Sequence, residues 1–234
     1  MPRTRVSALA LAAAAALLTG CASSERTDVL TADTLQNLTP QEALQRLKDG
    51  NRRFVSDNLT PVDYLAQKRA TAGGQYPKAV ILGCIDSRVP AEIIFDLGVG
   101  DAFVARVAGN FENTDILGSM EFATAVAGSK VIVVLGHTAC GAVKGAADGV
   151  ELGNLTSMLA NIDPAIAASQ GVPGEKSSKN EAYVNAIIRA NVVQTVADIE
   201  ARSPVMAERI ASGDLLVVGG VYDLTTGRVE WLDG

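Results

Sequence analysis

The chain has 234 residues, enough for one large domain. Of these residues 48% are hydrophobic and 20% are charged, which is typical of a globular protein and excludes a disordered one. The net charge of −6 and the aromatic content of 4% argue against a nucleic-acid partner, because an acidic surface repels phosphate and few rings are left for base stacking.

The N-terminal segment has the pattern of an export signal. Two arginines near its start precede an apolar stretch at residues 6–18, which is too short to span a bilayer comfortably. The letters LTGC at residues 18–21 then match the bacterial lipobox, in which the cysteine is lipidated after cleavage. We therefore predict a signal peptide at 1–20 and a lipid on Cys21. An ordinary signal peptide with a chance cysteine, or an uncleaved anchor, are the alternatives.

The lipobox also predicts where the protein acts. Residues 21–38 are interpreted as the lipidated cysteine and a polar tether, and residues 39–234 as the folded domain. The lipid would be the only contact with the membrane, and the protein would lie in the cell envelope on the periplasmic side. Ala22 after the cysteine, in place of a retaining aspartate, favours the outer membrane.

Beyond the tether, helical and strand patterns alternate. Residues 39–58 begin with a capping threonine, a proline and a first-turn glutamate, and then show apolar residues at helical spacing. The patterns predict helices at 39–58, 62–71, 115–128 and 181–202, a further helix starting at 141, strands at 78–84, 101–108 and 130–137, a loop at 171–180, and a strand with a short hairpin at 214–232. This alternation predicts an α/β fold with a mostly parallel central sheet flanked by helices.

Two short segments hold nearly all the soft metal ligands. Cys84 ends one predicted strand, His137 ends another, and Cys140 lies in the turn that follows. Because ligands bind at the carboxyl ends of parallel strands, the two segments are expected to meet at one edge of the sheet. Two thiolates and one imidazole suit zinc, and Asp86 could supply a fourth ligand. A disulfide between the two cysteines of an exported protein, with a satisfied core histidine, remains the alternative.

Asp86 has a second possible partner. Arg88 lies two residues further along the same turn, so a bidentate ion pair is sterically possible. A carboxylate that binds zinc closes the site, whereas a carboxylate that binds the arginine leaves the fourth position open for catalysis. A plain salt bridge within the turn is the other interpretation of this spacing.

The segments "CIDSRVPAEIIFDLGVGDAFVARVAGN", "GSMEFATAV" and "VIVVLGHTACGAVKGA" together resemble the beta-class carbonic anhydrases. The resemblance runs from about residue 40 to the end of the chain. It implies one zinc ion per subunit, bound by Cys84, His137 and Cys140, with Asp86 as exchangeable ligand or as partner of Arg88. It implies reversible hydration of CO2 to bicarbonate and a proton by attack of zinc-bound hydroxide.

The resemblance also implies an assembly and a substrate pocket. Members of the family form dimers or higher even oligomers, and N-terminal helices are expected to pack on a partner subunit. Gln75 would donate an amide hydrogen bond to the substrate, Phe103 and Ala108 would line the CO2 pocket from the neighbouring subunit, and the backbone N–H of Gly141 would face the site. From the sequence alone, Gln75 would be interpreted as a loop residue.

Two other functions stay open at this stage. Hydrolysis of a CO2-like molecule such as carbon disulfide or carbonyl sulfide would use the same fold and metal. A non-catalytic zinc-binding or redox-sensing envelope protein would keep the ligands without turnover. The presence of Asp86, Arg88 and Gln75 argues against the second, because storage of zinc needs none of them.

Overall fold

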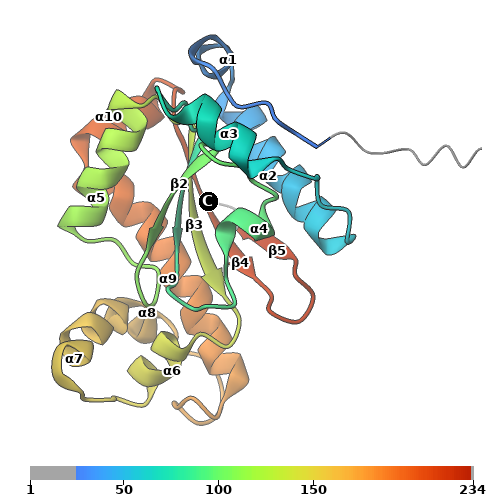
Figure 1. Ribbon diagram of the computed structural model, residues 1–234. Coiled ribbons are helices and arrows are strands. Elements are labelled where there is room, and N and C mark those ends of the chain that lie inside the picture. The colour runs from blue at the N-terminus through green and yellow to red at the C-terminus, as the bar shows by residue number, and fades with distance from the viewer. Residues whose placement is uncertain (1–24, 233–234) are drawn as a thin grey trace, which may run out of the picture.

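The protein was analysed as a computed structural model that describes residues 25–232. Its centre is a five-stranded sheet with strand order β2-β1-β3-β4-β5 (Figure 1). The first four strands are parallel and β5 is antiparallel to β4. The strands are β1 (Ala79–Gly83), β2 (Ala102–Arg106), β3 (Val131–His137), β4 (Leu216–Tyr222) and β5 (Val229–Leu232). The predicted α/β fold with a mostly parallel sheet is confirmed.

The side chains of the central strands divide into two hydrophobic layers. Successive residues of a strand point to opposite faces, so Val80 and Leu82 join one layer and Ile81 joins the other. The first layer packs against α5 (Thr114–Glu121), α9 (Glu181–Arg202) and α10 (Pro204–Ala211), and the second against α2 (Pro40–Val55) and α4 (Ala91–Ile94). The sheet is therefore covered on both faces, which explains the continuous apolar runs of β1 and β3.

The remaining helices lie around these layers. They are α1 (Ala32–Gln36), α3 (Tyr64–Thr71), the π-helix η1 (Phe122–Val126), α6 (Gly141–Ala147), α7 (Gly153–Leu159), the 3-10 helix η2 (Ala160–Ile162) and α8 (Asp163–Ala168). In Figure 1, α6, α7 and α8 lie at the end of the sheet where β3 finishes, and α1 lies at the other end.

The predicted elements correspond closely to the observed ones. The helix predicted at 181–202 is α9. The helix predicted at 39–58 is α2, and reciprocal hydrogen bonds between Thr39 and Glu42 form a capping box at its amino end. The helix predicted at 115–128 is α5 followed by η1. The chain leaves η1 through Gly128, whose φ of 81° places it in the left-handed region that favours glycine.

The segment expected to be a tether differs from the structure in part. Residues 25–38 lie against the domain: Arg26 pairs with Val62 in an isolated bridge, and Leu35 and Leu38 are buried in the second layer. Leu35 lies in α1, and Leu38 follows the end of that helix in a turn in which its N–H donates to the Leu35 carbonyl oxygen. The packed part of the chain thus begins before residue 39. The signal peptide and Cys21 lie outside the described residues.

The N-terminal helices α2 and α3 differ in how far their apolar side chains are buried. α2 packs on its own subunit, with Ala43 and Leu47 fully buried beneath it. α3 leaves the apolar side chains of Tyr64 and Leu65 mostly exposed. Of these two helices, α3 is thus the one whose apolar surface its own subunit leaves uncovered.

Candidate metal centre

The parallel sheet brings the two predicted clusters together at one edge. β1 pairs in register with β3, with Gly83 opposite Leu135, so Cys84 leaves β1 beside the last residues of β3. His137 is the final residue of β3, and Cys140 caps the amino end of α6 after a two-residue turn. Ala139 in that turn has a φ of 55°, a left-handed conformation that turns the chain sharply enough to bring Cys140 back toward the strand end.

The three side chains form a compact buried cluster. One ligand atom from each of Cys84, His137 and Cys140 lies within 4.8 Å of the other two. The two sulfur atoms are 4.0 Å apart, and neither cysteine is in a disulfide. Two thiolates bound to one tetrahedral zinc ion at about 2.3 Å each would lie about 3.8 Å apart. The observed separation fits that geometry and is much longer than a disulfide bond.

His137 is prepared to act as a ligand through one nitrogen. Its Nδ1 lies 2.9 Å from the carbonyl oxygen of Thr138, which fixes the tautomer with the proton on Nδ1. Its Nε2 is buried and has no hydrogen-bond partner among the described residues. A metal-binding histidine commonly donates its other N–H to a backbone carbonyl in this way. The unpartnered Nε2 and the two sulfur atoms together make a donor set that fits zinc.

The pKa values of the two thiols are shifted in opposite directions. The hydrogen bond with Cys140 lowers the pKa of the Cys84 thiol, and His137 and the backbone N–H of Gly109 add to that effect against burial. The contact with Cys84, followed by burial, raises the pKa of Cys140. Negative charge thus collects on the Cys84 sulfur, which the Gly109 N–H reaches at 3.5 Å. A cation at this place stabilises both thiolates.

Asp86 faces Arg88 and borders the cluster. Its Oδ1 accepts from the backbone N–H and from Nε of Arg88, both at 2.9 Å, and its Oδ2 accepts from Nη2 at 2.7 Å. These hydrogen bonds hold the pKa of the Asp86 carboxyl well below its usual range, against a smaller opposing effect of burial. Oδ2 is 3.9 Å from Nε2 of His137. The carboxylate therefore stays ionised at neutral pH, beside the cluster, with both oxygens bonded to the arginine.

Arg106, to which the sequence analysis gave no role, holds this turn in place. It is the last residue of β2, and its side chain donates to the carbonyl oxygen of Cys84 at 2.9 Å and to that of Asp86 at 2.6 Å. Both contacts depend on the pairing of β1 with β2, which the local pattern around Arg106 does not reveal. A charged residue ending an otherwise apolar strand was the only available signal.

The comparisons with known proteins agree with this geometry. A family profile for carbonic anhydrase matches residues 79–229. Carbonic anhydrase 2 of Mycobacterium tuberculosis is 40% identical over 200 residues, which cover 85% of this chain and 96% of that protein. A carbonic anhydrase of Pseudomonas aeruginosa is 33% identical over 192 residues, which cover 80% of this chain and 86% of that protein. The chain belongs to the beta-class carbonic anhydrase family.

Solved structures support the same assignment. A tetrameric beta-carbonic anhydrase of Sordaria macrospora superposes with a TM-score of 0.63 at 31% identity, covering 71% of this chain and 85% of that one. The beta-carbonic anhydrase CafA of Aspergillus fumigatus superposes with a TM-score of 0.64 at 26% identity, covering 82% of this chain and 90% of that one. The protein is thus a carbonic anhydrase with the Cys-His-Cys zinc site of its class.

Four residues of this carbonic anhydrase were predicted to bind substrate, and two of them lie close in sequence to the zinc site. Ala108 precedes Gly109, whose backbone N–H contacts the Cys84 sulfur, and Gly141 directly follows the ligand Cys140. Phe103 lies on β2, in edge-to-face contact with Phe122, and Gln75 is exposed in the loop before β1. Within the described part of the chain, no hydrogen bond joins Gln75 to the cluster. The substrate roles of all four residues stay predictions.

Removal of the metal is expected to make the cysteines sensitive to oxidation. The sulfur atoms are 4.0 Å apart, so a side-chain rotation brings them to the disulfide distance of about 2.05 Å. In a Cys21→Ser background, chelated protein treated with hydrogen peroxide should lose both remaining thiols faster than zinc-loaded protein, as thiol titration and peptide mass would measure. Equal rates of thiol loss with and without zinc would contradict this expectation.

Proposed function

We propose that this carbonic anhydrase interconverts CO2 and bicarbonate in the cell envelope, with Asp86 and Arg88 controlling access to the metal. The observation that carries the proposal is the buried cluster in which His137 Nε2 has no hydrogen-bond partner among residues 25–232 while Asp86 is held by Arg88. Three ligand atoms converge there, and the carboxylate that could complete the set is turned to the arginine. That arrangement leaves the fourth position available for substrate chemistry.

Cys84, His137 and Cys140 would hold the zinc ion. When bound, zinc supplies a Lewis acid that makes water nucleophilic near neutral pH. The chain's own residues set the conditions for that chemistry. The Gly109 N–H stabilises the Cys84 thiolate, and the Thr138 carbonyl orients the imidazole of His137. Arg106 fixes the turn that carries Cys84 and Asp86.

Asp86 would orient the attacking water. Because its carboxyl has a strongly lowered pKa, it acts as an acceptor at all pH values at which the enzyme works. An ionised carboxylate that accepts the water's hydrogen directs an oxygen lone pair toward the CO2 carbon. Arg88 keeps Asp86 from taking the metal position itself, and a change of partner would close the site.

The proton released by hydration must leave without a histidine relay. His137 is the only histidine of the chain, and its Nε2 belongs to the metal cluster. Buffer, Asp86 or water chains would carry the proton. The strongly lowered pKa of the Asp86 carboxyl makes it a weak proton acceptor at neutral pH, which favours buffer and water chains over Asp86.

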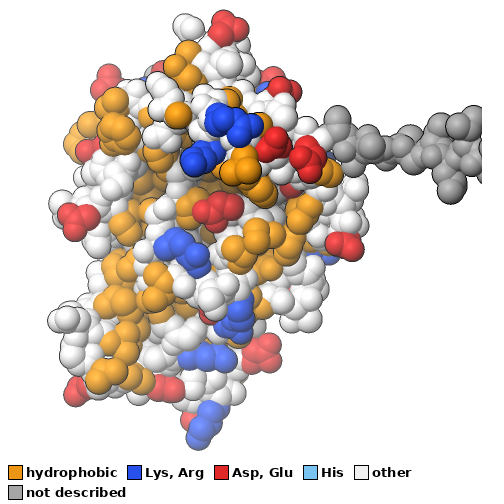
Figure 2. Space-filling model, viewed as in Figure 1, with side chains coloured by type: hydrophobic (Ala, Val, Ile, Leu, Met, Phe, Trp, Pro, Cys, Tyr) orange, Lys and Arg blue, Asp and Glu red, His pale blue; other side chains and the backbone are white. Residues whose placement is uncertain are grey.

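A second copy of the chain would complete the substrate pocket. β2 is an edge strand, and beside it lies an open groove of about 750 Å³ bounded by Phe103, Ala105 and Phe122. Figure 2 shows hydrophobic side chains gathered on this face of the molecule. An uncovered strand edge beside an apolar groove favours association. A dimer, or a larger even assembly, would bring Phe103 and Ala108 of one copy toward the metal centre of another.

The location in the envelope rests on the lipobox at Cys21, which lies outside the described residues. No helix between residues 25 and 232 is long and apolar enough to cross a membrane. The proposed attachment is a lipid on Cys21, with the domain on the periplasmic side of the membrane and preferentially of the outer one. The enzyme would then act on CO2 that crosses the envelope.

Replacing Asp86 by asparagine is expected to lower CO2 hydration with zinc still bound. The amide cannot accept the same paired hydrogen bonds from Arg88 and carries no charge toward the water. We expect kcat/KM to fall by about a hundredfold, the scale of one lost electrostatic contact in an active site, in stopped-flow measurements on zinc-loaded protein. Asp57→Asn, an exposed carboxylate remote from the site, is the control. Unchanged turnover in Asp86→Asn would refute the assigned role.

Placing a charge in the β2 groove is expected to separate the subunits. Phe122 is 53% exposed, so Phe122→Asp should leave the fold intact while opposing burial at an interface. Size-exclusion chromatography with light scattering should show a smaller species, with turnover reduced in parallel. Val193→Asp, at an equally exposed position on α9, is the matched control. An oligomer that persists in Phe122→Asp would place the interface elsewhere.

Changing Cys21 to serine is expected to release the protein from the membrane. The lipid would be the only anchor. When a detergent solution is separated into two phases, we therefore expect the parent chain in the detergent phase and the variant in the aqueous phase. Intact mass spectrometry should show the diacylated cysteine in the parent chain alone. Aqueous partition of the parent chain, without a lipid mass, would overturn the envelope proposal while leaving the carbonic anhydrase activity untouched.

A further inference from the structure

A cavity of about 410 Å³ lies at the end of the sheet opposite the metal centre. Lys78 and Asp101, which directly precede β1 and β2, form its floor, whereas the metal ligands follow the carboxyl ends of β1 and β3. The N-terminal segment at 26–34, α2 and the turn after α4 form its walls. The charged residues that line it are Arg26, Asp28, Arg46, Asp49, Arg53, Lys78, Asp96 and Asp101.

Two cations of this cavity share one carboxylate. Asp101 contacts Arg26 and the buried Lys78, each at 3.2 Å, and it also accepts from the backbone N–H of Gly98. Burial lowers the pKa of Lys78, Asp101 opposes that shift, and the charges of Arg26 and Arg46 add to it. The ammonium group thus lies within the field of two guanidinium groups, and Asp101 is the one carboxylate that pairs with it among the described residues.

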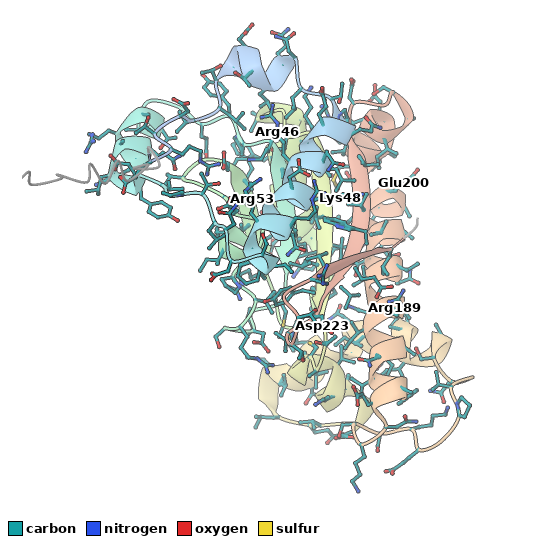
Figure 3. All side chains as sticks on the ribbon, turned by 90° about the vertical axis from the view of Figure 1, so that its right-hand side faces the viewer. Arg46, Lys48, Arg53, Arg189, Glu200 and Asp223 are labelled. Atoms are coloured by element: carbon teal, nitrogen blue, oxygen red, sulfur yellow. The ribbon has the colours of Figure 1, made fainter. Side chains whose placement is uncertain are left out.

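Two of these cations have hydrogen-bonding capacity to spare. The Nε of Arg26 is buried without an acceptor among the described residues. Arg46 makes no ion pair within 4.0 Å in the described part of the chain, although its charge helps to lower the pKa of Glu42, one turn away on α2. Arg46 and Arg53 are seven residues apart on α2 and so share one face of it, as Figure 3 shows.

Two of the other three acidic residues of the cavity are already paired with arginines. Asp96 accepts from Arg53 at 2.6 Å and from Thr60, and Asp49 is paired with Arg52, which does not line the cavity. Asp28 is exposed, and it has no ion pair among the described residues. The four cations and four carboxylates of the lining balance in formal charge. Among the described residues, however, the Nε of Arg26 has no acceptor and Arg46 has no ion pair, so donors remain free beside Lys78.

We propose that this cavity binds a phosphate-type oxyanion between Lys78, Arg26 and Arg46. Guanidinium groups present paired N–H donors that match the oxygens of such an anion, and an ammonium group adds a further charge. The cavity is large enough for a phosphate group carrying a substituent. Its place at the amino ends of the strands separates this site from the carbonic anhydrase centre.

The phosphate could be free in solution or belong to a phospholipid headgroup. Arg26 lies five residues after Cys21, a span of at most about 18 Å of extended chain. A lipid on Cys21 would therefore keep the cavity close to the headgroups. The cavity itself does not depend on that lipid, but the headgroup source rests on the proposed envelope location.

The test compares charge reversal at two arginines of the Cys21→Ser chain. Arg46→Glu places a negative charge on the cavity wall, and Arg69→Glu makes the same change at an exposed position of α3 outside the cavity. Calorimetric titration with inorganic phosphate is carried out at constant ionic strength. We expect saturable binding in the Cys21→Ser chain and in Arg69→Glu, and binding weakened at least about tenfold in Arg46→Glu. CO2 hydration should be equal in all three.

Vesicles distinguish the two sources of phosphate. Flotation with phosphatidylglycerol vesicles that depends on Arg46 but not on Arg69 would support a headgroup ligand, and phosphate binding without flotation would support free phosphate. Absence of saturable phosphate binding and of flotation, or equal losses in both variants, would overturn the site. Lipidation of Cys21 and CO2 hydration are measured separately, so failure of this site is distinguishable from failure of the proposed function.

Discussion

The parallel pairing of β1 with β3 is the contact on which the metal centre depends. Neighbouring strands lie about 4.8 Å apart, so residues that leave two adjacent strands at the same edge are within reach of one metal ion. Gly83 lies opposite Leu135, which leaves His137 extending two residues beyond the end of β1 while Cys84 begins its turn. A shift of one residue in this register would turn the ligands toward opposite faces. The buried apolar side chains of both strands, on two packed faces, prevent that shift.

The buried ligands require compensation that the surrounding backbone supplies only in part. His137 is fully buried, and both cysteines are nearly so. The Gly109 N–H and the Thr138 carbonyl satisfy one sulfur and one nitrogen, but Nε2 retains an unused lone pair. A metal cation resolves this deficit because it accepts electron pairs from both sulfur atoms and from Nε2 at once. Asp86, by contrast, is only partly buried, and Arg88 is 57% exposed in its side chain, so water competes for their ion pair. That exposure suits a carboxylate that changes partners.

The sequence predicted the sheet and the ligands because both are encoded locally. Continuous apolar runs mark buried parallel strands, and cysteine and histidine at strand ends are conspicuous in a chain with one histidine. The packed segment before residue 39 was not predicted, because its polar composition conceals two leucines that become buried only against a distant layer. The role of Arg106 was not predicted either, since its partners are carbonyl groups on another strand. Contacts made across the sheet by a single charged residue leave no periodic signal.

The two ends of the same parallel sheet present opposite chemical problems. At the carboxyl ends of β1 and β3, soft donors outnumber the groups that can satisfy them, and the deficit is positive charge. At the amino ends of β1 and β2, the Nε of Arg26 has no acceptor and Arg46 has no ion pair among the described residues, so hydrogen-bond donors are left unsatisfied. Because β1 connects both sites through a rigid, fully buried strand, each can be filled without a change in the sheet that carries the other. The fold can thus hold a catalytic cation at one edge and an anion at the other as independent equilibria.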